Sequence, residues 1–287
     1  MPKPHTSTVI EVKCRVPAPR LEVMTAPAPD LHVEFDGRPA TAEDLRIPAF
    51  AGYGHFTAMQ VRDRAVRGLS LHLDRLDSAN RELFGQPLDG ERVRELIGHA
   101  LDGAGVRDAS LRVHGFLPPD STATVVMVTV REPARADGAP RSLMPVPFAR
   151  SVPHIKRPGE FCQTYYGQQA RRAGFDEALL ISPGGMVTEG AITNIAFWDG
   201  TSVVWPDAPA LTGITMALLE SGLARTDRPS VRRGVPLDAV AAYRAAFVTN
   251  SQGIAPVHRI DDIPFTVDEG LMKMVGQVYD DSPRETV

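Results

Sequence analysis

Lysine is scarce in this sequence: four of the 287 residues are lysine, although lysine and arginine together number 31. Lys3 and Lys13 lie in the N-terminal 30 residues, Lys273 lies near the C-terminus, and Lys156 lies in the middle of the chain. The preference for arginine, with abundant glycine and proline, is typical of a GC-rich coding sequence. A lysine at a structured mid-chain position in such a sequence suggests a chemical requirement.

The sequence also lacks the features of several protein classes. The two cysteines, Cys14 and Cys162, provide neither a disulfide framework nor the spacing of metal ligands. No apolar run reaches the ~18 residues of a membrane helix, and the N-terminal 30 residues contain no apolar signal core. The net charge is −4, without a basic stripe interleaved with aromatics. We therefore expect a cytoplasmic globular protein with reduced thiols, without a metal, and without a nucleic-acid or membrane partner.

The N-terminal half predicts an extension followed by a small α+β domain. Six prolines disfavour regular structure in residues 1–30, although residues 8–12 could form an edge strand. Residues 31–140 contain a hairpin turn at Asp36 and Gly37, and apolar periodicity then alternates between strand and helix. The expected strands are 55–61, 65–69, 110–116 and 122–130, and the expected helices are 71–84 and 89–104. Residues 131–140 show no periodicity and are the expected domain boundary.

Residues 141–287 predict a second, larger α+β domain. A strand is expected at 143–148 and a helix at 161–174, ending at a glycine cap. A β-meander follows at 177–181, 186–189, 192–198 and 202–205, and then a helix from about residue 214 and strands at 245–249 and 255–260. The sequence contains no internal repeat. The predicted fold class is therefore α+β, with two halves packed on each other.

Two side chains carry the strongest chemical signals. Lys156 lies between an expected strand and an expected helix; a lysine is most often a solvated surface residue, but a primary amine can also form a Schiff base, which a guanidinium cannot. Glu189 lies in an apolar meander, where an unpaired carboxylate is costly. It either points outward from a turn or holds a heteroaromatic cation protonated.

Three further segments can bind an anion. Gly213-Ile-Thr215 opens a helix, and its backbone N–H groups can cradle a phosphate, unless Thr212 or Thr215 is an ordinary N-cap. Arg75 shares a helical face with His72 and suits a phosphate; the alternative is a solvated arginine paired with Asp74 or Asp77. Residues 247–257, which include Asn250, offer hydroxyls, an amide and a glycine bend, and could equally form a turn.

In this order, the segments resemble the class IV aminotransferase family, the fold-type IV pyridoxal-phosphate (PLP) enzymes, over residues 31–265. The family includes branched-chain and D-amino acid aminotransferases, R-selective amine transaminases and aminodeoxychorismate lyase. The resemblance is carried by seven blocks: Gly54–Thr57, His72–Leu76, Ile155–Lys156, Ala170–Leu179, Glu189–Gly190 with Asn194, Leu211–Thr215, and Asn250–Val257.

The resemblance implies a role for each matching position. Lys156 corresponds to the lysine that bonds to the cofactor, and Glu189 to the carboxylate at the pyridine nitrogen. The phosphate-binding positions correspond to Arg75, Ile214, Thr215 and Asn250. The resemblance also implies a homodimer with each active site near the subunit interface. It implies a smaller N-terminal α/β sandwich and a larger PLP-binding domain, residues 141–287, with a barrel-like β core.

The chain departs from the family at several positions. Many members have a tyrosine five residues after the lysine, and here that residue is Phe161; Tyr165 or Tyr166 could substitute for it. Met216 replaces an arginine that members often have after Gly-Ile-Thr. The arginines that bind the substrate carboxylate are not recognisable. Arg112 and His114 are candidates for this role, and strand alternation would place them on the same face.

The resemblance implies a PLP-dependent aminotransferase that moves an amino group between an amino acid or amine and a 2-keto acid. Lys156 would bind the cofactor and then shuttle a proton. One alternative is an aminodeoxychorismate lyase-type elimination that releases pyruvate. Another is a non-catalytic relative that serves as a binding protein, which Phe161 and Met216 would fit but Lys156 and Glu189 would not.

Overall fold

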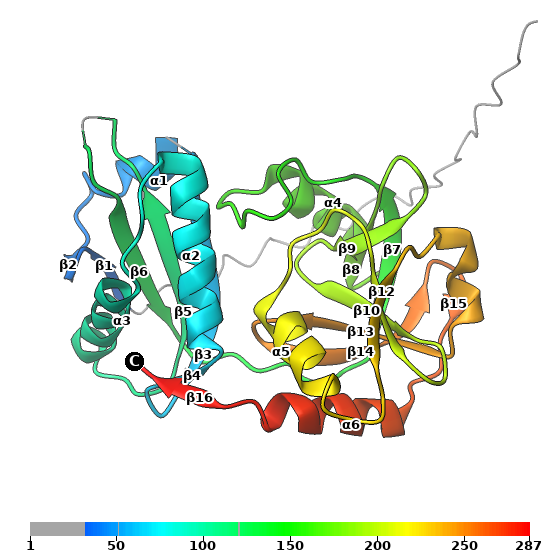
Figure 1. The fold of residues 1–287 in the computed structure, drawn as a ribbon. Coiled ribbons are helices and arrows are strands. Elements are labelled where there is room, and N and C mark those ends of the chain that lie inside the picture. Colours follow the sequence, from blue (N-terminus) through cyan, green and yellow to red (C-terminus); the bar gives the residue numbers. More distant parts are fainter. Residues whose placement is uncertain (1–31, 51, 120) are drawn as a thin grey trace, which may run out of the picture.

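The computed structural model describes residues 32–50, 52–119 and 121–287. The expected N-terminal extension, 1–30, and its edge strand, 8–12, lie outside these residues. Two β-sheets lie side by side, and the chain passes between them once through residues 132–140 and once through its C-terminal segment (Figure 1). The predicted α+β class is confirmed.

The first sheet has seven strands with helices packed on one face. Its order is β16 (Arg284–Thr286), β4 (Ala65–Arg67), β3 (Gly54–Arg62), β5 (Ala109–Phe116), β6 (Val125–Arg131), β1 (His32–Phe35) and β2 (Arg38–Pro39). Helices α2 (Leu69–Phe84) and α3 (Gly90–Ala104) bury Leu76 and Ile97 against Met59 and Val61. Alternate residues of β3 point to opposite faces, so Phe56, Ala58, Gln60 and Arg62 face away from this core.

The termini of the first-sheet elements follow local sequence signals. Asp89 caps α3 by accepting a hydrogen bond from the Glu91 N–H at 3.0 Å. The turn between β3 and β4 places Asp63 and Arg64 at φ 50° and 58°, the left-handed conformation that a two-residue hairpin requires. A short helix, α1 (Arg46–Phe50), follows β2 and was not predicted.

The second sheet has nine strands and curls so that β9 lies alongside β10 and β11. Its order is β12 (Ser230–Arg233), β11 (Val203–Pro206), β10 (Asn194–Trp198), β13 (Ala245–Asn250), β14 (Gly253–Ile260), β7 (Arg141–Pro147), β8 (Glu177–Ile181) and β9 (Val187–Gly190), and β15 (Ile263–Pro264) pairs with β14. Alternation on β13 divides its side chains: Val248 packs inside the curl, whereas Phe247 packs against the helices outside. This arrangement is the expected barrel-like core.

Three longer helices cover the outside of the second sheet. Helix α4 (Phe161–Arg172) packs Ala170 against β8, and α5 (Ile214–Leu223) packs Leu219 against β13. Helix α6 (Glu269–Asp280), which was not predicted, begins at Asp268, whose carboxylate accepts from the Leu271 N–H. No helix in the described part of the chain is long and apolar enough to span a bilayer.

The C-terminal strand returns to the first sheet, and the sequence did not predict this. After α6, β16 pairs antiparallel with β4, and Arg67 bonds to Asp280 at 3.0 Å (Figure 1). The C-terminal segment therefore provides a second connection between the two sheets, in addition to residues 132–140. The residue boundaries of the two domains stay a prediction.

Candidate active site

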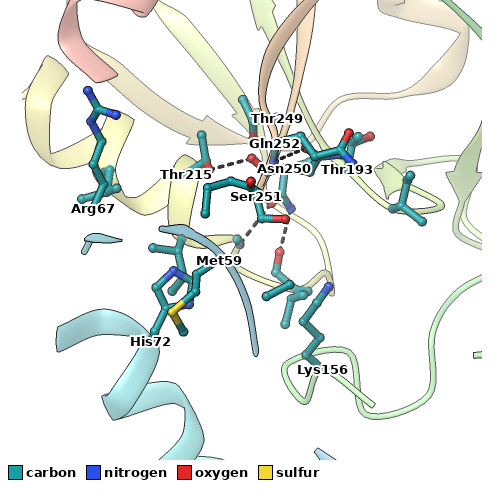
Figure 2. Close-up of a pocket in the computed structure, with 18 of the residues that line it drawn as sticks. Met59, Arg67, His72, Lys156, Thr193, Thr215, Thr249, Asn250, Ser251 and Gln252 are labelled. Atoms are coloured by element: carbon teal, nitrogen blue, oxygen red, sulfur yellow. Dashed lines mark hydrogen bonds between the residues drawn. The ribbon is translucent and has the colours of Figure 1, made fainter. Parts of the chain in front are cut away.

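A cavity of about 710 Å³ lies between the two sheets. Its walls come from β3, β4, α2, the segment between β7 and α4, β9, the start of α5 and the turn after β13. In Figure 2, Lys156 and Arg67 lie at opposite ends, with Thr215 and Asn250 between them. The volume lies within the ~300–1,000 Å³ range of small-molecule and cofactor sites.

Lys156 lies on the segment between β7 and α4, which contacts the first half of the protein. Its carbonyl accepts a hydrogen bond from the Phe56 N–H at 2.8 Å, and its Nζ lies 5.0 Å from the centre of the Phe56 ring. Burial, with the nearby charges of Arg75 and Arg150, lowers the pKa of Lys156 to about 7, although Glu189 opposes this shift. Much of the amine is therefore neutral at pH 7 and available as a nucleophile.

Glu189 lies on β9 with 3% of its surface exposed. Its Oε1 accepts from the Leu211 N–H at 3.4 Å and lies 3.5 Å from Arg150 Nη1. Burial raises the pKa of Glu189 to about 7, although Arg150 opposes the shift. A cationic ring nitrogen beside this carboxylate would favour its ionised form, so the site is suited to hold such a nitrogen protonated.

Arg150 is a site residue that sequence analysis missed. It is buried, and besides Glu189 it contacts Glu160 Oε1 at 3.4 Å and donates to the Ile155 carbonyl at 2.9 Å. It therefore joins the Lys156 segment to β9. It follows an irregular proline-containing strand, and no periodic pattern or motif distinguishes it from the other arginines in the sequence.

The N-terminus of α5 forms one wall of an anion-binding cup. Its cap residue, Gly213, provides no side-chain acceptor, so the first helical N–H groups lack capping partners. A Cβ at Gly213 would overlap Asn194 Oδ1, which accepts from the Gly213 N–H at 3.0 Å. Thr215 donates its hydroxyl to the Asn250 carbonyl at 2.8 Å (Figure 2). A glycine is therefore required at position 213, because a larger residue would collide with the Asn194 side chain on β10.

Arg75 and Thr249 supply the rest of the cup. The Arg75 Nε and the Thr249 Oγ1 are buried polar atoms that line the cavity and have no hydrogen-bond partner within the described residues. Such atoms are costly unless a ligand satisfies them. An anionic group in the cup would accept hydrogen bonds from both, so these residues fit a phosphate.

A buried chain of hydrogen bonds holds Arg75 in place. Arg75 Nη2 donates to Thr57 Oγ1, and Thr57 Oγ1 lies 2.6 Å from His72 Nδ1. Burial, Arg75 and Lys156 hold the pKa of His72 well below its ordinary value. Because His72 is neutral, its Nδ1 accepts the Thr57 proton and its Nε2 carries the ring proton. Burial also lowers the pKa of Arg75, to about 10, so it remains a cation.

Most of the residues predicted from sequence lie around this one cavity. They are Arg75, Arg112, Lys156, Glu189, Ile214, Thr215 and Asn250. His114 is the exception, because its ring stacks on Phe56 at 5.1 Å and is not part of the cavity wall. His114 therefore does not face the cavity directly, and Phe56 lies between it and a bound substrate.

None of the aromatic candidates on α4 contributes to the cavity wall. Phe161 is 76% exposed, and Tyr166 packs against Phe148 instead. Gln163 lines the cavity from the same helix, with Nε2 donating to the Ala191 carbonyl at 2.7 Å. The helical phase of α4 turns Gln163, and not Phe161, toward the cavity. The spacing of five residues after Lys156 did not predict this. No group of three or more His, Cys, Asp or Glu suited to a metal occurs among the described residues.

The geometry can be compared with known proteins. The family model described as amino-transferase class IV matches residues 54–260. The structure of branched-chain amino acid aminotransferase from Escherichia coli is 19% identical, with a TM-score of 0.75 over 87% of this chain and 93% of that one. A hypothetical aminotransferase from Mycobacterium tuberculosis in a PLP-bound form is also 19% identical, with a TM-score of 0.76 over 88% and 98%.

A third similar structure is described as a lyase. A putative 4-amino-4-deoxychorismate lyase from Legionella pneumophila is 18% identical, with a TM-score of 0.76 over 85% of this chain and 96% of that one. Comparison with curated protein sequences finds no significant match. At these identities the solved structures establish the shared fold, that of fold-type IV PLP enzymes.

The family match spans both sheets and most of the residues around the cavity. The amine, the buried carboxylate and the anion cup fit the aldehyde, the ring nitrogen and the phosphate of PLP. The chain therefore belongs to the class IV aminotransferase family of PLP-dependent enzymes.

Proposed function

We propose that the protein is an aminotransferase that moves an amino group between an amino acid or amine and a 2-keto acid. One observation supports this most: the Lys156 amine, with a pKa of about 7, shares a cavity with the buried Glu189 and the anion cup. Together they provide a nucleophile, a proton-holding carboxylate and an anchor.

The residues divide the work of binding. Arg75, Thr249, Asn250 and the start of α5 bind the phosphate, and Glu189 keeps the ring nitrogen protonated. Bound pyridoxal phosphate supplies an electron sink that stabilises negative charge at the substrate Cα. The positive charge of Arg150 lowers the pKa of Glu189 and so favours the ionised carboxylate. These groups fix the orientation in which an amino substrate meets Lys156.

Lys156 then acts as the proton carrier. Its Nζ would hold the cofactor and, when free, would carry the proton that leaves the substrate Cα. A pKa near 7 suits this exchange, because the neutral and protonated amine are both populated at neutral pH. Burial and the nearby charges of Arg75 and Arg150 keep the charge on this amine low.

Lys156→Ala tests the proposal. Borohydride reduction of the native protein with PLP should bond the cofactor permanently to the peptide that contains Lys156, as seen by mass spectrometry. Lys273→Ala is the matched control, because Lys273 is exposed on α6. The control should keep the adduct and the activity, and Lys156→Ala should lose both. An adduct elsewhere, with activity retained in Lys156→Ala, would refute the assignment.

A lyase reaction is the second candidate, favoured by the similarity to the Legionella protein. Pyruvate released from aminodeoxychorismate without a keto-acid acceptor would support elimination, and amine-dependent conversion of a keto acid would support transamination. A protein with neither activity that still binds PLP would be a binding protein.

We also propose that the enzyme is a cytoplasmic homodimer. Phe161, Tyr165 and Ile192 are exposed apolar side chains on α4 and the neighbouring cavity wall, and a second subunit would cover them. Sedimentation at micromolar concentration would determine the mass, and cell fractionation would determine the location.

A further inference from the structure

Helix α2, which carries Arg75, begins without a cap from its own sequence. Its cap residue is Gly68, which has no side chain, and the first turn of the helix contains no acidic residue. The first N–H groups of a helix need acceptors, and the positive end of the helix dipole favours a negative charge. An acceptor for this helix end must therefore come from elsewhere in the chain.

Glu285, on β16, supplies the acceptor. Its Oε1 accepts from both the Ser70 N–H and the Ser70 hydroxyl at 3.2 Å, and its Oε2 lies 3.3 Å from the same backbone nitrogen. Ser70 is the second residue of α2. A carboxylate at this position satisfies a free N–H group and complements the helix dipole. Glu285 is not part of the cavity wall, so it would affect a bound cofactor through α2 and not by contact.

The first sheet holds Glu285 beside the start of α2. Glu285 lies opposite Val66 in the antiparallel pair of β16 and β4. The next residue, Thr286, is fixed by α3, because its carbonyl accepts from Arg94 at 2.7 Å. Val287 then packs against the core of the first sheet. The position of the carboxylate is therefore determined by the sheet and α3, and α2 begins where the carboxylate can reach it.

The start of α2 packs directly against the start of α5, which forms one wall of the anion cup. Gly68 has φ 67°, and a Cβ there would meet Ile214 at 3.2 Å and Leu218 at 3.3 Å, closer than an ordinary contact. Arg75, from α2, and Ile214, from α5, both line the cavity. The separation of Arg75 from the other wall of the cup therefore depends on where α2 begins.

The segment that carries Glu285 is also anchored on α5. Helix α6 precedes β16 and crosses α5 closely, since a Cβ at Gly222 would overlap Val278 (Figure 1). Arg67, the residue before the α2 cap, bonds to Asp280 at the end of α6 at 3.0 Å. Helices α5 and α6, strand β16 and the start of α2 thus form a closed series of contacts beside the cup.

We propose that Glu285 is a positioning residue for the cofactor phosphate: it fixes the start of α2 and thereby holds Arg75 against the start of α5. Without this carboxylate, the first turn of α2 should fray, and Arg75 should spend less time in the cup. The effect should fall on retention of the cofactor and not on its ring or aldehyde. The proposed role rests on the assignment of Arg75 to the phosphate.

PLP and pyridoxal provide a matched pair of probes, because pyridoxal has the same ring and aldehyde but no phosphate. Equilibrium dialysis of the full chain measures the affinity of each. Glu285→Ala should weaken PLP binding about fivefold, the loss typical of a helix cap, and change pyridoxal binding by less than about twofold. Glu285→Gln keeps an acceptor oxygen without the charge, so it should weaken PLP binding only about twofold. Circular dichroism should stay native in both variants.

Glu95→Ala is the matched control, because Glu95 is an exposed carboxylate on α3 outside the cavity. It should leave both affinities unchanged. Native PLP affinity in Glu285→Ala would overturn the proposal, as would an equal loss for PLP and pyridoxal or the same loss in Glu95→Ala. Arg75→Ala separates the two assignments. Native PLP affinity in that variant would refute the cup and with it the role of Glu285, whereas native affinity in Glu285→Ala alone would refute only the role of Glu285.

Discussion

In the two sheets, burial shifts the pKa values of titratable side chains in opposite directions, because the buried groups are bases in one sheet and acids in the other. On the first sheet and α2, burial lowers the pKa values of His55, His72 and His114, so these bases are neutral. On the second sheet, burial raises the pKa values of Glu177 and Glu189 to about 7, so these acids tend to neutrality. The cause is the same, because a charged group loses hydration in either wall.

This comparison shows which groups can stay charged in the cavity. Arginine keeps its proton even when it is buried, and the described cavity walls contain seven arginines. The first-sheet side contributes anion binders supported by neutral partners, as Arg75 is by Thr57 and His72. The second-sheet side contributes the carboxylate and the lysine whose pKa values lie near neutrality. Anion binding is therefore shared by the two walls, because Thr249, Asn250 and the start of α5 lie on the second-sheet side, and the proton-transferring groups also lie on that side.

Among the variants that keep Lys156, Glu189→Gln should produce the largest effect, because it removes the proton-holding group of the second-sheet wall. An amide cannot carry the negative charge that stabilises a protonated ring nitrogen. We expect turnover to fall at least about 100-fold, corresponding to ~2.7 kcal/mol in the barrier, while circular dichroism and PLP content stay native. Glu160→Gln is the control, since Glu160 also contacts Arg150 but does not line the cavity. Native turnover in Glu189→Gln would show that another carboxylate holds the ring.

Arg75→Ala should act on cofactor retention rather than on the chemical step. Losing a buried guanidinium from the phosphate cup should weaken the affinity for PLP about 30-fold, or ~2 kcal/mol. Equilibrium dialysis would measure it, and Arg81→Ala on the same helix is the control, because Arg81 is exposed and pairs with Asp77. The same affinity in Arg75→Ala and Arg81→Ala would show that Arg75 does not hold the cofactor's phosphate.

Periodic segments made much of this fold predictable from the sequence. The strands and helices between residues 54 and 131 were expected within a few residues, because apolar alternation and helical spacing persist there. The predictions failed near the C-terminus, where α6 and β16 were missed. The pairing of β16 with β4 joins residues more than 200 positions apart, and no local pattern encodes such a contact.

The candidate site was predictable where motifs specify it. Lys156, Glu189 and the Gly-Ile-Thr turn follow from residue type and order, and they line one cavity. Arg150 and Gln163 were missed, and Thr249 was covered only as one of the hydroxyls of the 247–257 segment, because these roles depend on which way one strand end or one helical turn faces. Chemistry that is local in sequence can be predicted, and chemistry assembled by topology cannot.

The smallest expected effect tests the opposition between the two sheets directly. Glu177 is buried, accepts from the Ile192 N–H at 2.7 Å and from the Thr193 hydroxyl, and does not line the cavity. With a folded pKa of about 7 and a usual value of 4.5, the folded state binds its proton more tightly. Its contribution to stability is therefore full below pH 4.5 and is lost as pH rises through 7, by about 2 kcal/mol between pH 5 and 7.

His114 should have the opposite effect over the same interval. Its folded pKa of about 3 lies below the usual 6.5, so its contribution to stability is full above pH 6.5. That contribution falls by about 2 kcal/mol between pH 7 and 5. The free energy of unfolding should be measured by urea at several pH values. Glu177→Gln should remove the decrease in this free energy between pH 5 and 7, whereas His114→Phe should remove the decrease between pH 7 and 5. If both variants shifted the profile in the same direction, the division of neutral acids and neutral bases between the sheets would be wrong.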